Sequence, residues 1–277
     1  FIACIMNILL DLLFVATFQM GAKGAALATM LAQTTSVLTS LLIIRKRELP
    51  FEFHTKDIGF DSSYIKNILS LGAPIAIQSG LVSVSFLAVT AILNTYGVIA
   101  SAAVGIVAKI TSLVMIVPQA FSQSISAFTA QNFGAKRMDR VNQGLKYSIS
   151  ISLVFGIIMA YLGIWHGTIF TQFFTNDPET TQAALLYLKS YSIDTVLVCF
   201  LFSMNGYFNG CGKTKFVMLQ SVVCAFCIRI PLAYLISRID TSTLFEIGLA
   251  TPASTFTQII LCFIFYRHFQ KELLNRY

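Results

Sequence analysis

One carboxylate inside an apolar run near the start of the sequence is the first group that could do chemistry. The run is NILLDLLFV, residues 7–15, and Asp11 is its one charged residue. Asn7 lies four positions earlier, so on a helix the two side chains share a face one turn apart. A carboxylate at membrane depth can be neutralised by taking up a proton or by holding Na+ with neighbouring oxygen atoms. Asn7 and Asp11 are therefore a candidate ion-binding pair.

The following apolar run supplies a partner face for this pair. Thr29 and Gln33 are also four residues apart, so they too lie one turn apart on a helix. A ridge of small residues runs beside them: Gly24, Ala28 and Ala32. Small side chains let two membrane helices approach closely. We therefore expect the two runs to pack together, with Thr29 facing Asn7 and Asp11.

Other polar groups at membrane depth are candidates for lining a substrate cavity. They are Gln33, Gln78, Lys109, Asp194 and Arg229. Polar residues inside spans are costly, so each is a functional candidate by default. For each one singly, a structural hydrogen bond between helices is the competing and commoner role. For the pair of Asn7 and Asp11 we favour the functional interpretation.

The remaining reactive residues show no catalytic or metal-binding spacing. NGCGKTK at 209–215 resembles a phosphate-binding loop, but Tyr207 stands where that loop needs its first glycine. We interpret it as a tight turn between two helices, with its lysines at the membrane surface. The three histidines are scattered, and the six cysteines lie mostly in apolar runs, where cysteine packs as a small hydrophobe. We expect neither an enzyme nor a bound cofactor, and no metal beyond Na+ at Asp11.

Composition places the chain among multi-pass membrane proteins. Apolar residues make up 56% of the 277 residues and charged residues only 11%, whereas about a quarter of the residues in soluble domains are charged. Runs of about 20 apolar residues, the length that crosses a bilayer, recur along the chain. They predict an all-α integral membrane protein with eight transmembrane helices, at about 1–19, 22–44, 70–96, 99–131, 144–169, 186–209, 214–237 and 246–267.

Basic residues gather in alternate loops. When successive spans run in opposite directions, one side receives Arg45, Lys46, Arg47, Lys56, Lys66, Lys136, Arg137, Arg140, Lys146, Lys213, Lys215, Arg267, Lys271 and Arg276. The positive-inside rule makes this side cytoplasmic, together with the C-terminus, in a prokaryotic inner membrane. Topology and contact with anionic lipids therefore explain the net charge of +7, and no nucleic acid partner is expected.

The longest polar stretch divides the chain. We expect the last two helices of one lobe at 1–44, a cytoplasmic linker at 45–69 and a six-helix lobe at 70–277. The second half of the linker is either an amphipathic helix on the inner surface or a solvated connection. A weak repeat crosses this divide, because GAALATMLAQ at 24–33 is similar to LATPASTFTQ at 249–258. Such internal repeats are typical of transporters.

Six segments, in order along the chain, resemble the MATE (multidrug and toxic compound extrusion) family. They are NILLDLLFV at 7–15, GAKGAALATMLAQ at 21–33, LSLGAPIAIQ at 69–78, SAFTAQNFGAKRMDR at 126–140, FNGCGKTK at 208–215 and RIPLAYLI at 229–236. The resemblance covers essentially the whole chain. It implies twelve helices in two lobes around a central cavity. This chain would then be N-terminally truncated, containing part of the fifth helix, the sixth helix and the complete second lobe.

The resemblance also implies an activity and a site. Family members export organic, often cationic, compounds in exchange for H+ or Na+. In related members an Asn and an Asp on the fifth helix and a Thr on the sixth form a cation site, and these match Asn7, Asp11 and Thr29. The NorM-type branch adds acidic residues on the seventh and tenth helices. Here residues 70–96, which match the seventh helix, contain no Asp or Glu. Asp194, on the tenth, lies about one turn nearer the outer face than the resemblance to that branch would place it. A DinF-like branch, coupled through the first lobe, fits better.

Two other functions fit parts of the sequence. A lipid-linked oligosaccharide flippase of the same superfamily would need a basic cavity, for which Lys109 and Arg229 are available. An intramembrane enzyme would need a nucleophile, a base or a metal constellation, and the sequence shows none. The sequence therefore favours a monomeric, cation-coupled exporter of small organic molecules in the lipid bilayer.

Overall fold

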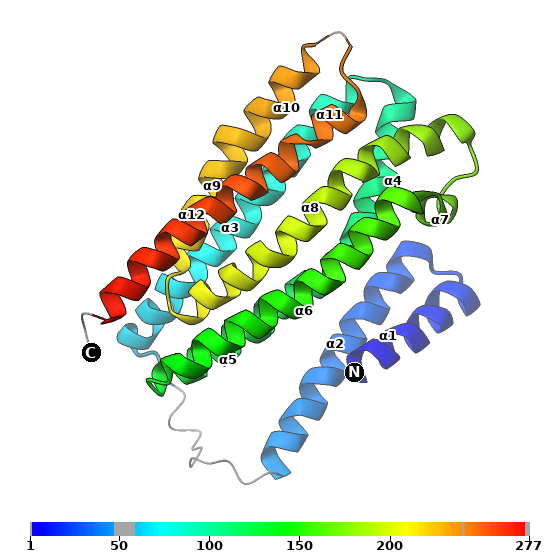
Figure 1. Ribbon diagram of the computed structural model, residues 1–277. Coiled ribbons are helices and arrows are strands. Elements are labelled where there is room, and N and C mark those ends of the chain that lie inside the picture. Colours follow the sequence, from blue (N-terminus) through cyan, green and yellow to red (C-terminus); the bar gives the residue numbers. More distant parts are fainter. Residues whose placement is uncertain (1, 47–58, 240, 275–277) are drawn as a thin grey trace. The chain divides into compact units, whose positions relative to one another are not determined.

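The computed structural model describes residues 2–46, 59–239 and 241–274, and every regular element in these ranges is a helix (Figure 1). The chain forms two compact units, Phe1–Asp61 and Ser62–Tyr277. Unit 1 contains α1 (Ile2–Asp11), the π-helix η1 (Leu12–Thr17) and α2 (Gly21–Lys46). Unit 2 contains α3 (Ser62–Asn94), α4 (Val98–Val114), α5 (Ile116–Gly134), α6 (Met138–Trp165), α7 (Gly167–Gln172), α8 (Pro178–Gly210), α9 (Thr214–Cys224), the π-helix η3 (Ala225–Arg229), α10 (Ile230–Ser237), α11 (Leu244–Gly248) and α12 (Ala250–Leu274).

Among the described residues, seven helical segments are long and apolar enough to cross a membrane. They are Gly21–Arg45, Ser62–Asn94, Val98–Gly134, Met138–Trp165, Pro178–Gly210, Thr214–Ser237 and Leu244–Lys271. The eighth predicted span, at 1–19, corresponds to the shorter apolar helix Ile2–Thr17, which is below membrane length. The protein is an all-α, multi-pass membrane protein, as the composition predicted.

Several helix boundaries differ from those predicted. The span predicted from 186 begins at Pro178, because Asp177 caps the helix by accepting a 2.9 Å hydrogen bond from the Thr180 backbone N–H. The long span predicted at 99–131 divides at Met115 into α4 and α5, three residues before Pro118. Proline has no N–H to bond the preceding turn, which explains the break.

The predicted linker at 45–69 is only partly described. Its last eight residues, 62–69, belong to α3, which therefore starts earlier than the predicted residue 70. Ile65, Ile68 and Leu69 are exposed on this first part of α3. The second half of the linker, predicted as either an amphipathic helix or a solvated connection, is thus helical from Ser62 as the start of α3. Residues 47–58 lie outside the described ranges.

Helix α8 is the central element of unit 2 (Figure 1). It packs against α4, α5, α6, α11 and α12, and much of its length is buried. Serines take part in its contact with α6: the Ser148 hydroxyl donates to the Ser203 hydroxyl at 3.0 Å, and Ser152 donates to the Cys199 carbonyl at 3.0 Å. Small polar residues thus join two apolar helices without leaving their own groups unpaired.

Three of the basic loops come together at one end of unit 2. The turn after α8, interpreted above as a tight turn, has Gly212 at φ 74°, and the N–H of Lys213 bonds the Phe208 carbonyl at 2.8 Å. The Lys213 ammonium lies 4.9 Å from the centre of the Phe269 ring near the end of α12. Phe133, near the end of α5, also contacts Phe269, with 6.5 Å between ring centres. The charge pattern in the sequence therefore corresponds to a shared end of the bundle.

Replacing Gly206 should destabilise unit 2, because a Cβ at this position would clash with the Ser122 backbone carbonyl and the Ile125 side chain of α5. We expect Gly206→Ala to lower the free energy of unfolding by about 1–3 kcal/mol, the usual cost of overpacking. The matched control is Gly80→Ala on α3, where a Cβ meets no atom within 4 Å. It should change stability by less than about 1 kcal/mol. Thermal unfolding of the purified protein in detergent measures both, and equal effects would contradict the packing described here.

Asp177 should make stability depend on pH in the acidic range. Its hydrogen bonds from the Thr180 side chain and backbone lower its pKa below the usual 3.8. Its contribution is therefore present above about pH 4 and is lost as the pH falls through the lowered pKa. Asp177→Asn keeps a capping side chain without the charge, so the variant should unfold at a lower temperature than wild type at pH 6. This difference should shrink as the pH is lowered below about 4, and a difference that does not change with pH would contradict the effect of the charge.

Candidate functional site

The structure brings two of the predicted ion-site residues of unit 1 together. The Asn7 side-chain Nδ2 donates to the Thr29 hydroxyl at 3.4 Å, across the interface of α1 and α2. The Thr29 hydroxyl in turn donates to the Ala25 carbonyl at 3.0 Å, which holds it in one orientation. The facing predicted for Asn7 and Thr29 is confirmed as a contact, while their role in ion binding stays a prediction.

Asp11 lies one turn beyond Asn7, at the last position of α1. Its side chain is half-buried, and its Oδ1 atom is buried without a hydrogen-bond partner among the described residues. Buried polar atoms are nearly always hydrogen-bonded within the protein, so an unpartnered carboxylate oxygen is uncommon and marks a candidate ion-binding group. The buried Oδ1 of Asp11 is therefore a candidate cation ligand, one turn along the chain from the contact of Asn7 with Thr29.

The chain changes its helical form directly after Asp11. Residues Leu12–Thr17 form the π-helix η1, in which the Phe18 N–H bonds the Leu13 carbonyl at 3.0 Å. Short π-helical segments inside α-helices are frequently found at functional sites, because the extra residue per turn redirects side chains. The composition of the run does not predict this change, since Leu12–Thr17 is as apolar and helix-compatible as α1.

The ridge of small residues makes the contact of α1 and η1 with α2 possible. Gly24 is buried, and Ala28 and Ala32 are 0% and 2% exposed. A Cβ at Gly24 would lie 3.1 Å from the Phe14 backbone carbon and 2.9 Å from the Met20 Cβ. A larger residue would therefore separate the two helices, and the predicted role of the ridge is confirmed.

The residues predicted to line a substrate cavity do not form one group. Gln33 is exposed on α2. Gln78 on α3 donates to the Ser221 hydroxyl of α9 at 3.0 Å, a contact between helices. Lys109 on α4 is exposed, and its ammonium lies 5.8 Å from the centre of the Phe174 ring. For Gln78 the structure therefore favours the structural role that the sequence left open.

Asp194 and Arg229 are buried charged residues of unit 2. Asp194 on α8 is 3% exposed and Arg229 at the end of η3 is 4% exposed. The Arg229 Nη1 donates to the Ser85 hydroxyl at 3.0 Å, and its guanidinium carbon lies 4.2 Å from the centre of the Phe86 ring. Sequence reasoning missed Ser85 and Phe86, because nothing in an apolar run of α3 indicates that an arginine 144 positions later lies against it.

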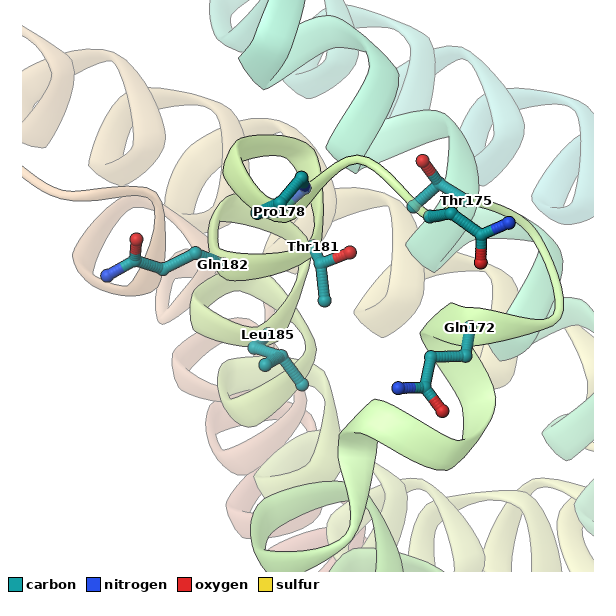
Figure 2. A pocket seen from close by; sticks show the side chains of 7 residues that line it. Gln172, Thr175, Pro178, Thr181, Gln182 and Leu185 are labelled. Atoms are coloured by element: carbon teal, nitrogen blue, oxygen red, sulfur yellow. The ribbon is translucent and has the colours of Figure 1, made fainter.

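One open cavity lies away from all of these residues. It has a volume of about 380 Å³ and lies where the end of α7 meets the start of α8, as Figure 2 shows. Its lining residues are Gln172, Thr175, Asn176, Pro178, Thr181, Gln182 and Leu185. None of them is charged, and none was predicted to take part in the site.

Long apolar spans with polar and charged groups held between them define a multi-pass membrane protein. The family model MatE matches residues 74–235, which is more than half of the chain. The chain belongs to the MatE family.

Several relatives and solved structures match nearly the whole chain. The probable multidrug resistance protein YoeA of Bacillus subtilis is 25% identical over 98% of this chain and 60% of its own length. A FAD transporter of Shewanella oneidensis is 26% identical over 95% of this chain and 58% of its own length. The structure of a MOP superfamily transporter from Pyrococcus furiosus matches with a TM-score of 0.88 at 19% identity, covering 96% of this chain and 60% of that chain. A MATE structure in complex with MaL6 matches with a TM-score of 0.90 at 19% identity, covering 99% of this chain and 62% of that chain.

These relatives are longer than this chain, which spans about 60% of the length of the first curated matches. At 19% identity the solved structures show the fold alone. The comparisons therefore establish the family and the fold of this chain.

The contact between Asn7 and Thr29 can be tested by cross-linking. We expect cysteines placed at both positions, with the exposed native Cys4 and Cys227 replaced by serine, to be joined by a short bifunctional thiol reagent. The matched control pairs Asn7→Cys with Thr34→Cys, because position 34 points to a different side of α2. Mass spectrometry of the digested protein detects the linked peptides. Equal cross-linking of the two pairs would show that α2 is not oriented as described.

Proposed function

We propose that the protein is a cation-coupled antiporter that exports small organic compounds, often cationic drugs or toxins, across the membrane. H+ or Na+ binds at Asp11, assisted by Asn7 and Thr29. Membership of the MatE family and the multidrug resistance names of relatives support the export of drugs. The single observation that carries the coupling site is the unpartnered Oδ1 of Asp11, one turn from the contact of Asn7 with Thr29.

Neutralising Asp11 changes how η1 and α2 pack. A charged carboxylate between two apolar helices attracts water or ions and holds the helices apart, whereas a neutral one allows closer packing. The close approach at Gly24 lies at this same interface, so small changes in the position of η1 reach α2 directly. Cation binding thereby shifts the balance between two arrangements of unit 1, as a coupled transporter requires.

The orientation follows from the positions of the basic residues. The end of unit 2 that carries the turn with Lys213 and the end of α12 lies in the cytoplasm of a prokaryotic cell, with the protein as a monomer in the inner membrane. The support is the shared end of these loops, through the contacts of Phe269 with Lys213 and Phe133.

The role of Asp11 is tested in the complete gene product that contains this chain. We expect Asp11→Asn to lower cation-driven ethidium efflux from vesicles by at least about tenfold, because the amide cannot release a proton or offer a charge to Na+. The matched control is Asp139→Asn, an exposed carboxylate in the first turn of α6, which should leave efflux unchanged. Undiminished efflux by Asp11→Asn would show that the coupling site lies elsewhere.

The class of substrate is tested with the same vesicles. One relative is named as a FAD transporter, so the panel contains FAD beside the cationic dye ethidium. Export of ethidium and not FAD is the expected result for a drug exporter. Flipping of a lipid-linked oligosaccharide, with neither compound transported, would replace the proposed substrate class.

A further inference from the structure

The open cavity between the end of α7 and the start of α8 takes no part in the proposed coupling site. Its volume of about 380 Å³ is within the range of small-molecule sites. Every polar side chain that lines it is neutral: Gln172, Asn176 and Gln182 contribute amides, and Thr175 and Thr181 contribute hydroxyls. The cavity is therefore large enough for a small molecule and offers it uncharged hydrogen-bonding groups.

Close packing fixes the two walls of the cavity. A Cβ at Gly167, the first residue of α7, would lie 2.8 Å from the Leu185 side chain, so α7 lies directly against α8. The Thr181 hydroxyl is held by donating to the Asp177 carbonyl at 2.7 Å. Figure 2 shows Thr181 and Leu185 of the α8 wall pointing toward Gln172 of the α7 wall. The cavity is thus a built feature of unit 2, with side chains facing each other across it.

The start of α8 does not offer an anion site to this cavity. The Asp177 carboxylate accepts from the Thr180 N–H at 2.9 Å, and the Asp177 carbonyl accepts from the Thr181 N–H at 3.0 Å. Pro178 has no N–H to offer. The N–H groups that attract anions to a helix N-terminus are therefore used or missing here. Since no lining residue is charged, an ion entering the cavity would lose water without gaining a counter-charge.

The lining groups match a ligand that carries hydroxyls. An amide offers donors and an acceptor side by side, and a hydroxyl group can both donate and accept. The exposed side-chain amides of Gln172 and Asn176 make no hydrogen bond to another described residue, so their donors and acceptors are available. A molecule with several hydroxyls, such as a sugar, can pair with both kinds of group at once.

Aromatic residues place this end of unit 2 at a membrane surface. Trp165 ends α6 and is 67% exposed, and the Tyr161 ring stacks on it with 5.2 Å between ring centres. Phe173, directly after α7, is 81% exposed. Exposed Trp and Tyr at the end of a span are typical of the level of the lipid headgroups. The cavity begins at Gln172, beside these aromatic residues, and so lies where headgroups are found.

We propose that this cavity binds an uncharged group with several hydroxyls, such as a sugar, either as the headgroup of a glycolipid or as a free molecule. The site lies at the opposite end of α8 from the turn with Lys213, so the proposed orientation puts it on the outer side of the membrane. The binding itself depends neither on that orientation nor on transport.

The test is lipid binding by the complete gene product that contains this chain, measured by native mass spectrometry in a detergent without sugar. The probes are diglucosyl diacylglycerol, diacylglycerol with the same chains, and phosphatidic acid. We expect the glycolipid to be retained in preference to the other two. Excess maltose that displaces it shows that the sugar group is recognised by itself, whereas retention despite maltose assigns the site to the lipid form. Both results support the proposal, and equal or better retention of diacylglycerol or phosphatidic acid overturns it.

Variants assign the binding to this cavity. Gln172→Met with Asn176→Leu keeps the side-chain bulk and removes both amides, so glycolipid affinity should fall about tenfold. The matched control is Gln131→Met, an exposed glutamine near the end of α5, which should leave the affinity unchanged. Gln172→Trp fills the cavity by a different route and should also remove the preference for the glycolipid. Wild-type affinity in either cavity variant, or an equal loss in the control, would overturn the proposal, whether or not the protein transports ethidium.

Discussion

A charge buried among membrane helices has to be neutralised, and this constraint organises both units of the protein. In a medium where an unpaired ion costs several kcal/mol, each buried carboxylate needs a proton, a cation or a fixed counter-charge. Asp11 has amide and hydroxyl neighbours and an unpartnered oxygen, which suits an exchangeable ion. Arg229, buried in unit 2, is held by the Ser85 hydroxyl and the Phe86 ring of α3.

Close contact between helices is the second constraint, and glycine and serine satisfy it. Gly24 allows α2 to approach Phe14 within unit 1, and Gly206 allows α8 to approach Ser122 of α5 within unit 2. Apolar side chains facing lipid give no net force between helices, so stability depends on such close packing and on hydrogen bonds across it. The serine contacts of α6 with α8 are of this kind.

Both π-helical segments of the described chain border a charged residue, half-buried Asp11 in one case and buried Arg229 in the other. The segment η1 begins directly after Asp11, and η3 ends at Arg229. In a π-helix the backbone hydrogen bonds close a wider turn than in an α-helix. A shift of these bonds by one residue converts one form to the other, which turns the neighbouring side chains to a new direction. The proline that follows Arg229 at position 231 removes a backbone donor, which favours the irregular turn there. No comparable residue follows Asp11 in the run that becomes η1.

The sequence alone determined the class of fold, the approximate spans and the composition of the first site. In lipid, a long apolar run has to bond its own backbone groups, so it forms a helix. Spacing by four residues then predicts which side chains share a helical face. Asn7, Thr29 and the ridge of Gly24, Ala28 and Ala32 were therefore within reach of sequence reasoning. The early start of α8 was also signalled, by Asp177 before Pro178, although hydropathy pointed to a later residue. Only the tertiary structure decided that Arg229 lies against Ser85 and Phe86, because these residues come from helices far apart in the chain. Helical periodicity describes one helix at a time, whereas the partner of a buried charge is chosen by how several helices pack.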